Sequence, residues 1–518
     1  MSEEQHMTSH RRSSSQCEGE EFMRNALSVV VLGASGDLAK KKTYPALFDL
    51  YTHEMLPKHV TICGFARSEK SLEEFRSSIG AKLEGGAEGE KEAFLDRCYY
   101  IAGQYDSEDS FKTVAERLTE WEGGQGAGPK ANRLYYFAIP PNVFLASATA
   151  IKAQGLSPSG WTRLIVEKPF GHDLESATAL ADNMNAIFTE EYLYRIDHYL
   201  GKEMVQNTLV LRFANAWLEP LMNRNHVASI TVTFKENFGT QGRGGYFDKY
   251  GIIRDIMQNH LMQVVSLITM EAPSAVAGDL ASAAIRNAKV AVLKCMEEVD
   301  LAHVVTGQYV ADDKGNEGYL DDETVPDDSV TPTYCAALLK IRNPRWDGVP
   351  IIMKAGKALD ERKAEIRIQF KTAPAAGFMF DQFPVSRNEL VIRIQPNEAV
   401  YLKCNVKAPG LHTEPIVSEM DLSYGERYAE VYSPDAYTRL ILEVLRGNQS
   451  TFVRRDELIE AWRIWTPVLE RIENDGVRPL PYTYGARGLK EGDELAAAAG
   501  FQHDKNYSWR KHGEKKAG

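Results

Sequence analysis

The sequence is poor in cysteine, and its cysteines follow no pattern that would bind a metal or build a disulfide framework. The 518 residues contain six of them, at Cys17, Cys63, Cys98, Cys295, Cys335 and Cys404. None belongs to a Cys-x-x-Cys pair, and none has histidine partners at zinc-finger spacing. We therefore predict neither a disulfide scaffold nor a metal site, and a reducing compartment fits best.

Long apolar runs are missing as well. The longest, such as residues 26–32, are far shorter than the roughly 20 residues that a membrane helix needs. The polar N-terminal region lacks the apolar stretch of a signal peptide. We expect a soluble, cytoplasmic protein. The C-terminal Lys-Lys-Ala-Gly is no peroxisomal Ser-Lys-Leu address, although other routes leave an additional organellar pool open.

Positive charge is in deficit. Lysine and arginine number 60 against 72 aspartates and glutamates, which gives a net charge of −12. A protein with this balance does not hold nucleic acid or an anionic membrane through a broad positive field. We therefore expect neither kind of partner, and any anionic ligand must be met by cations gathered locally.

The pattern of apolar residues divides the chain into three parts. Residues 1–24 are polar and without hydrophobic period, so we expect a disordered extension. In residues 25–204 short apolar runs alternate with helical patterns, which predicts a parallel sheet covered by helices, an α/β domain of the Rossmann type. Residues 205–518 have longer runs that alternate apolar with polar side chains. These predict a larger α+β domain built on a mostly antiparallel sheet.

Several elements can be placed by their residues. The strands expected in the first domain are 27–32, 60–64, 133–138 and 163–166, and the helices expected there include 39–51 and 71–83. In the second domain we expect strands over 229–234, 366–370 and 390–395. A helix is expected to begin at Ser433-Pro434 and to end at Gly447, which stands where a C-cap is required.

Residues 29–38 predict a strand, a glycine turn and a helix start. Such a turn points backbone N–H groups and the positive end of a helix dipole at an anion. It differs from the usual Gly-x-Gly-x-x-Gly fingerprint, and the Gly-x-x-x-x-Gly-Lys-Ser/Thr loop of many ATPases is absent. Two interpretations stay open: an ordinary turn, or a dinucleotide site formed by Gly33, Ser35, Gly36, Asp37 and Leu38.

The second expected strand favours the dinucleotide interpretation and indicates which dinucleotide. Enzymes that prefer NAD commonly end this strand with an acid that holds the ribose 2′-hydroxyl. Here the strand is followed by Arg67, which could hold a 2′-phosphate through a charge-assisted fork. This favours NADP, although Arg67 alone would also fit a solvated loop cation.

Residues 195–202 bring a carboxylate, an imidazole, a phenol and an ammonium group into one short run. His198, Tyr199 and Lys202 could donate to a phosphate dianion, and Asp197 could orient an imidazole from elsewhere in the chain. Taken alone, the same residues would equally fit a helix N-cap beside a core histidine.

Together with several other strings in the same order, these residues resemble the glucose-6-phosphate dehydrogenase family. The resemblance spans roughly residues 27 to 510. The strings that carry it are 33–45, 166–171, 195–206, 234–236, 242–248, 254–260 and 354–365.

The resemblance implies an activity and a catalytic pair. The activity is oxidation of glucose 6-phosphate at C1 to 6-phosphogluconolactone with reduction of NADP, the first step of the oxidative pentose phosphate pathway. The resemblance makes His260 the base that removes the C1 hydroxyl proton and Asp197 its orienting partner. It implies substrate contacts from Lys168, His198, Tyr199, Lys202, Glu236, Asp255, Lys357 and Arg362. Lys168 would also touch the cofactor, and a cis peptide before Pro169 would place Lys168 between the two ligands.

The resemblance also implies a second, structural NADP, which eukaryotic members of the family carry. The matching positions are Lys363, Arg367, Arg393, Tyr401, Lys403, Asp421, Arg487, His503 and Trp509. His503 is a departure, because the family pattern usually has a tyrosine that flanks the adenine there. An imidazole can still stack on the base, though more weakly.

Two alternative functions have to be weighed against this one. Another NADP-dependent sugar oxidoreductase of the glucose-fructose oxidoreductase type would be expected to have the Gly-x-Gly-x-x-Gly turn that is absent here. A non-catalytic NADP-sensing protein would be favoured if His260 or Asp197 had been lost, and both are present. The resemblance further implies a homodimer or homotetramer formed through the sheet of the second domain.

Overall fold

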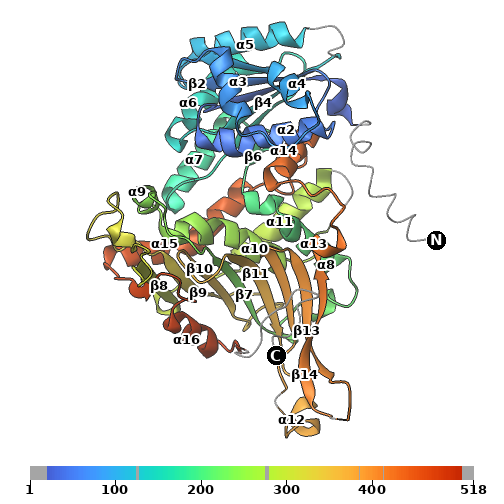
Figure 1. Cartoon of the computed structure of the whole chain (residues 1–518), viewed down its shortest axis with the longest axis vertical. Coiled ribbons are helices and arrows are strands. Elements are labelled where there is room, and N and C mark those ends of the chain that lie inside the picture. Colours follow the sequence, from blue (N-terminus) through green and yellow to red (C-terminus); the bar gives the residue numbers. More distant parts are fainter. Residues whose placement is uncertain (1–19, 124–127, 275–278, 384, 412, 504–518) are drawn as a thin grey trace, which may run out of the picture. The chain divides into compact units, whose positions relative to one another are not determined.

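The structure is a computed structural model that describes residues 20–123, 128–274, 279–383, 385–411 and 413–503. The chain forms two compact units (Figure 1). Unit 1 consists of the chain up to Gly201 together with residues 273–287 and 431–459, two segments that we assigned from the sequence to the second domain. Unit 2 consists of residues 202–272, 288–430 and 460–518.

Unit 1 is built on a six-stranded parallel sheet with the strand order β3-β2-β1-β4-β5-β6. Its strands are β1 (Ala26–Leu32), β2 (Val60–Ala66), β3 (Cys98–Ala102), β4 (Ala131–Phe137), β5 (Thr162–Val166) and β6 (Leu193–Arg195). Every residue of β1 and β4 is buried. This follows from the topology, because parallel strands are joined by helices that cover both faces of the sheet.

The alternation of side chains along β1 separates two cores. Val29 and Val31 pack in one cluster with residues of the helix α2 (Tyr44–Thr52) and the helix α14 (Ala436–Arg446). Val30 and Leu32 pack in the other, with residues of α5 (Glu108–Glu122) and α6 (Phe144–Ala150). The remaining helices of the unit are η2 (Glu21–Arg24), η3 (Ala39–Thr43), α3 (Leu72–Gly80), α4 (Glu90–Asp96), η4 (Pro141–Val143), η5 (Ile151–Gly155), α7 (Leu174–Ile187), η6 (Glu190–Tyr192) and η7 (His198–Gly201).

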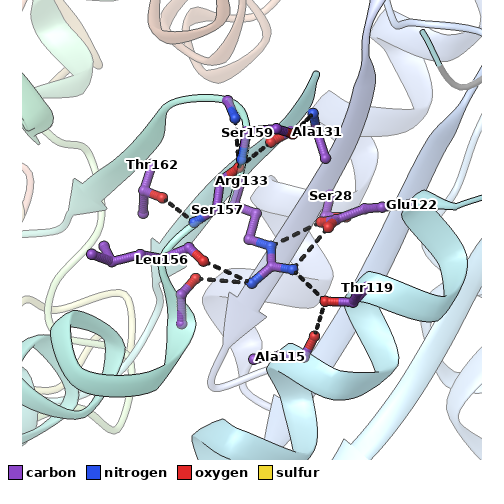
Figure 2. A network of polar contacts seen from close by, with 12 residues as sticks. Ser28, Ala115, Thr119, Glu122, Ala131, Arg133, Leu156, Ser157, Ser159 and Thr162 are labelled. Carbon is purple, nitrogen blue, oxygen red and sulfur yellow. Dashed lines mark hydrogen bonds and ion pairs between the residues drawn. The ribbon is translucent and has the colours of Figure 1, made fainter. Parts of the chain in front are cut away.

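A buried ion pair ties α5 to the sheet (Figure 2). The guanidinium of Arg133 in β4 donates two hydrogen bonds to the carboxylate of Glu122, at 2.8 and 2.9 Å. Further bonds run from Arg133 to the hydroxyl of Thr119 and to the carbonyl of Leu156, and Ser28 donates to Glu122 at 2.8 Å. Only 2% of the Arg133 side chain and 5% of the Glu122 side chain are exposed. Because the hydrogen-bonding groups of both side chains are engaged, the attraction between the two charges offsets much of the free energy that their desolvation costs.

The expected parallel sheet is confirmed, with differences at the edges. All four strands expected in the first domain are present with ends shifted by no more than two residues, whereas β3 and β6 were not anticipated. The helix expected at Ser433-Pro434 begins instead after Asp435, whose carboxylate caps the backbone N–H of Tyr437 at 2.9 Å. It ends at Gly447, which has a φ of 82° as a C-cap requires.

The N-terminal extension is described only in part. Of the segment 1–24 that we expected to be disordered, residues 1–19 lie outside the described residues. For Glu21–Arg24 the expectation was wrong, because these residues form η2. The physical reason is Phe22, which is buried in the core beside α14, and the ion pair of Glu21 with Lys130 at 2.7 Å.

Unit 2 is built on a nine-stranded sheet with the order β14-β13-β12-β11-β7-β10-β9-β8-β15. Only the pairs β7/β10 and β8/β15 are parallel, which confirms the mostly antiparallel sheet. The strands are β7 (Val227–Lys235), β8 (Val304–Val310), β9 (Tyr334–Leu339), β10 (Ile351–Gly356), β11 (Lys363–Phe370), β12 (Glu389–Gln395), β13 (Ala399–Lys407), β14 (Pro415–Ser423) and β15 (Leu480–Thr483).

Two helices of unit 2 carry residues that were predicted or found to line a site. The π-helix η9 (Ile253–Leu261) packs against β7 and β10, and α16 (Lys490–Ala498) packs against β8 and β9. The others are α8 (Glu203–Phe213), η8 (Glu219–Leu221), α9 (Gly244–Phe247), α10 (Met262–Thr269), η10 (Leu301–His303), η11 (Tyr319–Asp321), α12 (Ala376–Met379) and α13 (Tyr424–Arg427); α11 (Asp279–Lys294) and α15 (Arg455–Asn474) have residues of both units. Within the described part of the chain, none of the helices combines the length and apolar character needed to cross a membrane.

Candidate active site

The turn after β1 requires glycine at its first position. Gly33 has a φ of 81°, and a Cβ placed there would lie 2.1 Å from the carbonyl oxygen of Ala138. The turn is held by hydrogen bonds from Gly33 N to the Phe65 carbonyl at 2.9 Å and from Gly36 N to the Gly33 carbonyl at 2.8 Å. Helical backbone begins at Asp37, whose side chain is exposed and pairs with Lys41 at 2.9 Å. Since Gly33 and Gly36 use their own N–H groups inside the turn, a dinucleotide phosphate here would have to be met by the N–H groups at the helix start.

Arg67 follows the end of β2, the strand next to β1. Its side chain is exposed, its guanidinium carbon lies 5.7 Å from the centre of the Tyr105 ring, and it forms no ion pair with any described residue. The adjoining carboxyl ends of β1 and β2 thus present a glycine turn and a cation, and no described carboxylate pairs with this arginine. That arrangement suits a nucleotide with an extra phosphate on its ribose.

The carboxyl ends of β5 and β6 bring four further predicted residues to the same edge of the sheet. Val166 and Arg195 are paired in the parallel register, so Lys168 and Asp197 follow neighbouring strand ends. Asp197 is 4% exposed, and one of its carboxylate oxygens accepts the backbone N–H of Tyr199 at 2.9 Å. His198 and Tyr199 stand at the start of η7, and the Lys168–Pro169 peptide is cis.

Glu167, which directly precedes Lys168, was not among the residues predicted from the sequence. Its carboxyl is 6% exposed and accepts a hydrogen bond of 2.5 Å from the phenol of Tyr136, which is fully buried. Burial raises the pKa of Glu167 to about 7, and the carboxylate of Asp197 works in the same direction, while the Tyr136 bond and Lys168 oppose it. A carboxyl that holds its proton near neutral pH therefore lies beside the predicted substrate residues.

In unit 2, two predicted substrate residues meet at the ends of parallel strands. Gly356 at the end of β10 pairs with Lys235 at the end of β7, so Lys357 and Glu236 come next to each other. The Lys357 ammonium lies 2.5 Å from the Glu236 carboxylate and 5.1 Å from the centre of the Phe247 ring. Such a pair offers both a donor and an acceptor to a polyhydroxylated ligand.

The π-helix η9 carries Asp255 and His260. π-Helical turns inside helices are rare and often occur at functional sites. His260 is 1% exposed, and its backbone N–H bonds to the side-chain oxygen of Asn259 at 2.6 Å. Lys202 is the N-cap residue of α8, and Arg362 is exposed between β10 and β11. His260 belongs to unit 2 and Asp197 to unit 1, so their pairing stays a prediction from the resemblance.

A second group of predicted residues lines one cavity of about 530 Å³ in unit 2. Alternation along the strands explains why they meet, because Lys363, Glu365 and Arg367 share one face of β11 and Glu389 faces the same way from β12. Seven of the nine residues predicted for the second nucleotide line this cavity: Lys363, Arg367, Arg393, Tyr401, Lys403, Arg487 and His503.

The cavity has a surplus of positive charge. Seven lysine and arginine side chains face four carboxylates, and several of these groups are buried and paired. Arg367 lies 2.5 Å from Glu389 and 3.1 Å from Glu365. Burial alone would raise the pKa of Glu365, but Arg367 and Lys363 hold it below its ordinary value. The cations are Lys235, Lys354, Lys363, Arg367, Arg393, Lys403 and Arg487, and the carboxylates are Glu361, Glu365, Glu389 and Asp493.

The two other residues predicted for this site are not among the described residues that line the cavity. Asp421 is exposed on β14 opposite Tyr401 of β13 and is not among the lining residues, and Trp509 lies outside the described residues. Lys235, Lys354, Glu365, Glu389 and Asp493 line the cavity and were not named from the sequence. The alternation of Lys363, Glu365 and Arg367 along one strand could have identified Glu365, whereas Asp493 comes from a helix far along the chain.

Unit 1 has the strand order and the glycine turn of a Rossmann-type dinucleotide-binding domain, a fold that many nicotinamide-dependent oxidoreductases share. Two family models give a finer assignment. The glucose-6-phosphate dehydrogenase NAD binding domain matches residues 30–207, and the glucose-6-phosphate dehydrogenase C-terminal domain matches residues 209–510. The chain therefore belongs to the glucose-6-phosphate dehydrogenase family.

Similar proteins extend over nearly the whole chain. A glucose-6-phosphate 1-dehydrogenase from Dictyostelium discoideum is 51% identical over 487 residues, which are 94% of this chain and 97% of the relative. A cytoplasmic isoform from Solanum tuberosum is 50% identical over 490 residues, 93% of each chain. A solved structure of a glucose-6-phosphate dehydrogenase in complex with its substrate glucose-6-phosphate is 45% identical, with a TM-score of 0.88, and the match covers 93% of this chain and 99% of that one.

Proposed function

We propose that this chain oxidises D-glucose 6-phosphate at C1 to 6-phospho-D-glucono-1,5-lactone with hydride transfer to NADP, the first step of the oxidative pentose phosphate pathway. The observation that carries the proposal is the relationship to glucose-6-phosphate dehydrogenases of about half identity over nearly the full length. The turn after β1, the cation after β2 and the groups at the ends of β5, β6, β7 and β10 supply chemistry that this reaction needs.

In this proposal His260 is the base. A hydride can leave C1 only as the C1 hydroxyl loses its proton, so a group with a pKa near neutrality must be within hydrogen-bond reach of that hydroxyl. The NADP cofactor, when bound, supplies the hydride acceptor. Asp197 would fix the tautomer of the imidazole and stabilise the imidazolium that forms. The bond from Tyr199 N to Asp197 already holds that carboxylate in one orientation.

The substrate contacts divide by charge. His198, Tyr199 and Lys202 would hold the phosphate dianion, since each can donate a hydrogen bond to it. Glu236 and Asp255 would accept from sugar hydroxyls, and the cationic groups Lys168, Lys357 and Arg362 would donate to the substrate. The Lys357–Glu236 ion pair at 2.5 Å supports this division, because it places one donor and one acceptor together before any sugar binds.

NADP is proposed over NAD for a specific reason. Gly33, Ser35, Gly36, Asp37 and Leu38 would surround the pyrophosphate, and they serve either nucleotide equally. Arg67 distinguishes them, because a guanidinium gains from a 2′-phosphate and gains little from a 2′-hydroxyl. The exposed position of Arg67 and the absence of an ion pair between it and any described carboxylate support this preference.

We also propose that the cavity of unit 2 binds a second, structural NADP. Its cationic surplus suits a polyanion, and Tyr401 and His503 offer rings that could pack against a base.

A thermal shift tests this second site, because a ligand that binds only the folded state stabilises it by RT ln(1 + [L]/Kd). In a His260→Asn background NADP should raise the melting temperature, and a further Arg393→Ala substitution should reduce that rise. No difference between the two variants would contradict the second site.

One assay tests the reaction itself. Reduction of NADP is followed by absorbance with glucose 6-phosphate, with unphosphorylated glucose and with NAD as the alternative cofactor. Loss of the substrate phosphate leaves cations unpaired at about 1–3 kcal/mol each, so glucose should react at least ~100-fold less efficiently. Turnover of a different sugar alone would favour another sugar oxidoreductase. NADP binding without turnover of any sugar would favour the NADP-sensing alternative.

The compartment and the assembly are proposed from the relatives. The relative from Solanum tuberosum is cytoplasmic by name, and we infer the same compartment for this chain. We infer a homodimer or homotetramer formed through the sheet of unit 2. The edge strand β14 supports this, since Met420 is 62% and Ile416 is 44% exposed on it. Light scattering on the purified protein gives the assembly directly.

A further inference from the structure

A hydrogen bond joins Arg487 and His503, which both line the cavity of unit 2. An Nη atom of Arg487 contacts Nε2 of His503. Because a guanidinium can only donate, Nε2 must be the acceptor, and a nitrogen that accepts cannot carry a proton. Of the possible forms of the ring, a neutral imidazole with its proton on Nδ1 is the one that fits this contact. A proton added at Nε2 would break this bond and set two cations against each other.

The surroundings of His503 disfavour its protonation. Burial lowers the pKa of His503, and the charge of Arg487 adds to this effect, followed by Arg367 of β11 and Lys354 of β10. Asp493 of α16 is the one group among these that works in the opposite direction, and its carboxylate lies 2.6 Å from the Lys354 ammonium. Besides these charges, the ring of Phe501 lies 6.3 Å from the imidazole, edge to face.

A phosphate in the cavity would reverse this balance. Each phosphate oxygen can accept from Arg487, so a bound phosphate competes with His503 for the same guanidinium. The released Nε2 would then face a group of negative charge, and a protonated imidazole would gain a charge-assisted hydrogen bond from it. The cationic surplus that disfavours protonation would be offset by the ligand at the same time.

We propose that NADP binding in this cavity is coupled to the uptake of a proton by His503. The proposal rests on the second nucleotide site proposed above and adds a regulatory property to it. Affinity at this site rises as the pH falls through the neutral range, because the bound state holds the proton more tightly than the free state. The limiting slope for one proton is about tenfold in affinity per pH unit.

The coupling is a property of this residue rather than of the site as a whole. A phenol, with an ordinary pKa of about 10, takes up no proton near neutrality. His503→Tyr is therefore the matched control, since it keeps an aromatic ring at the position. His503→Gln is the second control, because an amide keeps a hydrogen-bond acceptor for Arg487 and cannot be protonated.

Calorimetric titration with NADP in two buffers of different ionisation enthalpy measures the protons taken up on binding. It is done on the full-length wild type and both variants at about pH 6.5, 7.2 and 8. The catalytic site contributes equally to all three proteins and cancels in the differences. At pH 7.2 and 8 the phosphate of NADP, with a pKa near 6, is already largely deprotonated before it binds. We expect the wild type to take up a larger fraction of a proton than either variant. We also expect the affinity of its second site to be several-fold higher at pH 6.5 than at pH 8, with a smaller change in both variants.

Each way in which the proposal can fail gives a different experimental result. If all three proteins bind two NADP molecules per chain with the same proton uptake, the role of His503 is overturned and the second site stands. If the wild type binds a single NADP per chain, the second site fails and the coupling fails with it. If only one variant loses the excess proton uptake, the coupling does not belong to the imidazole and the proposal is wrong.

Discussion

The phenol of Tyr136 donates a hydrogen bond of 2.5 Å to the carboxyl of Glu167. In the sequence Glu167 directly precedes Lys168, which is predicted to contact the substrate. Both side chains are buried, and burial raises the pKa of Glu167 to about 7. A carboxyl that keeps its proton can lie next to Asp197 without a second full negative charge at the strand ends.

Substitution of Glu167 by glutamine should change how stability depends on pH. The ordinary pKa is near 4.5 and the folded one about 7, so the folded state binds the proton more tightly. The stabilising effect of that proton is present below about pH 4.5 and is lost as the pH rises to about 7. Relative to the wild type, Glu167→Gln should gain on the order of 2 kcal/mol between about pH 5 and pH 8. Urea unfolding at both pH values measures this.

Glu175→Gln is the control for that experiment. Glu175 is an exposed glutamate in the first turn of α7. Its substitution should leave the difference from wild type nearly constant over the same range. A Glu167→Gln curve parallel to the wild type would show that the buried carboxyl does not titrate as described.

Removal of Glu122 should be strongly destabilising. Its loss leaves the buried guanidinium of Arg133 without its carboxylate, which costs about 3–5 kcal/mol. Glu120 on the same helix pairs with Arg117 at the surface, with 61% of its side chain exposed. Glu120→Ala should therefore cost no more than about 1 kcal/mol. Equal effects of Glu122→Ala and Glu120→Ala in denaturant unfolding would contradict the role of the network in Figure 2.

Gly33→Ala should strongly weaken cofactor binding. The added Cβ would have to occupy space 2.1 Å from the carbonyl oxygen of Ala138, at a φ of 81° that alanine rarely adopts. The turn must shift, and its amides lose their aim at the phosphates. Fluorescence titration with NADPH should show at least ~100-fold weaker binding. Gly123→Ala is the control, because its Cβ would make only ordinary contacts at 3.5 Å or more; weak binding by both variants would point to general damage instead.

Arg67→Ala should weaken NADP and spare NAD. A charge-assisted hydrogen bond contributes about 1.5–3 kcal/mol, so KM for NADP should rise by about 10- to 100-fold. NAD lacks the 2′-phosphate and should show little change. Steady-state kinetics with both cofactors measure the ratio directly. An equal loss for both would mean that Arg67 supports the fold of the loop rather than reading the phosphate.

The parts of the fold that depend on local pattern could be predicted from the sequence. Strands β1, β2, β4 and β5 were predicted because buried parallel strands read as short apolar runs. β3 is a half-buried edge strand and β6 has only three residues, so neither has enough periodicity to be identified. The sheet of unit 2 followed from period-2 alternation, which also placed Arg367 on the polar face of β11.

The site was less accessible to such reasoning. The glycine turn and Arg67 could be interpreted from their neighbours in the sequence, because the ends of the first two strands have well-known roles in dinucleotide-binding domains. Glu167 could not, because its hydrogen bond to Tyr136 joins two residues that are 31 positions apart. His260 and Asp197 are separated by several helices and a long strand, so no spacing rule connects them, and only the family resemblance suggested the pair.

The most direct test is the kinetics of His260→Asn with glucose 6-phosphate and NADP, with equilibrium binding of the substrate measured on the same protein. Loss of a general base costs about 10²- to 10⁴-fold in rate. Asparagine keeps a polar side chain at the position and cannot take the proton. The account predicts a kcat lower by that factor with substrate affinity within a few-fold of wild type. A variant that turns over at close to the wild-type rate would contradict it.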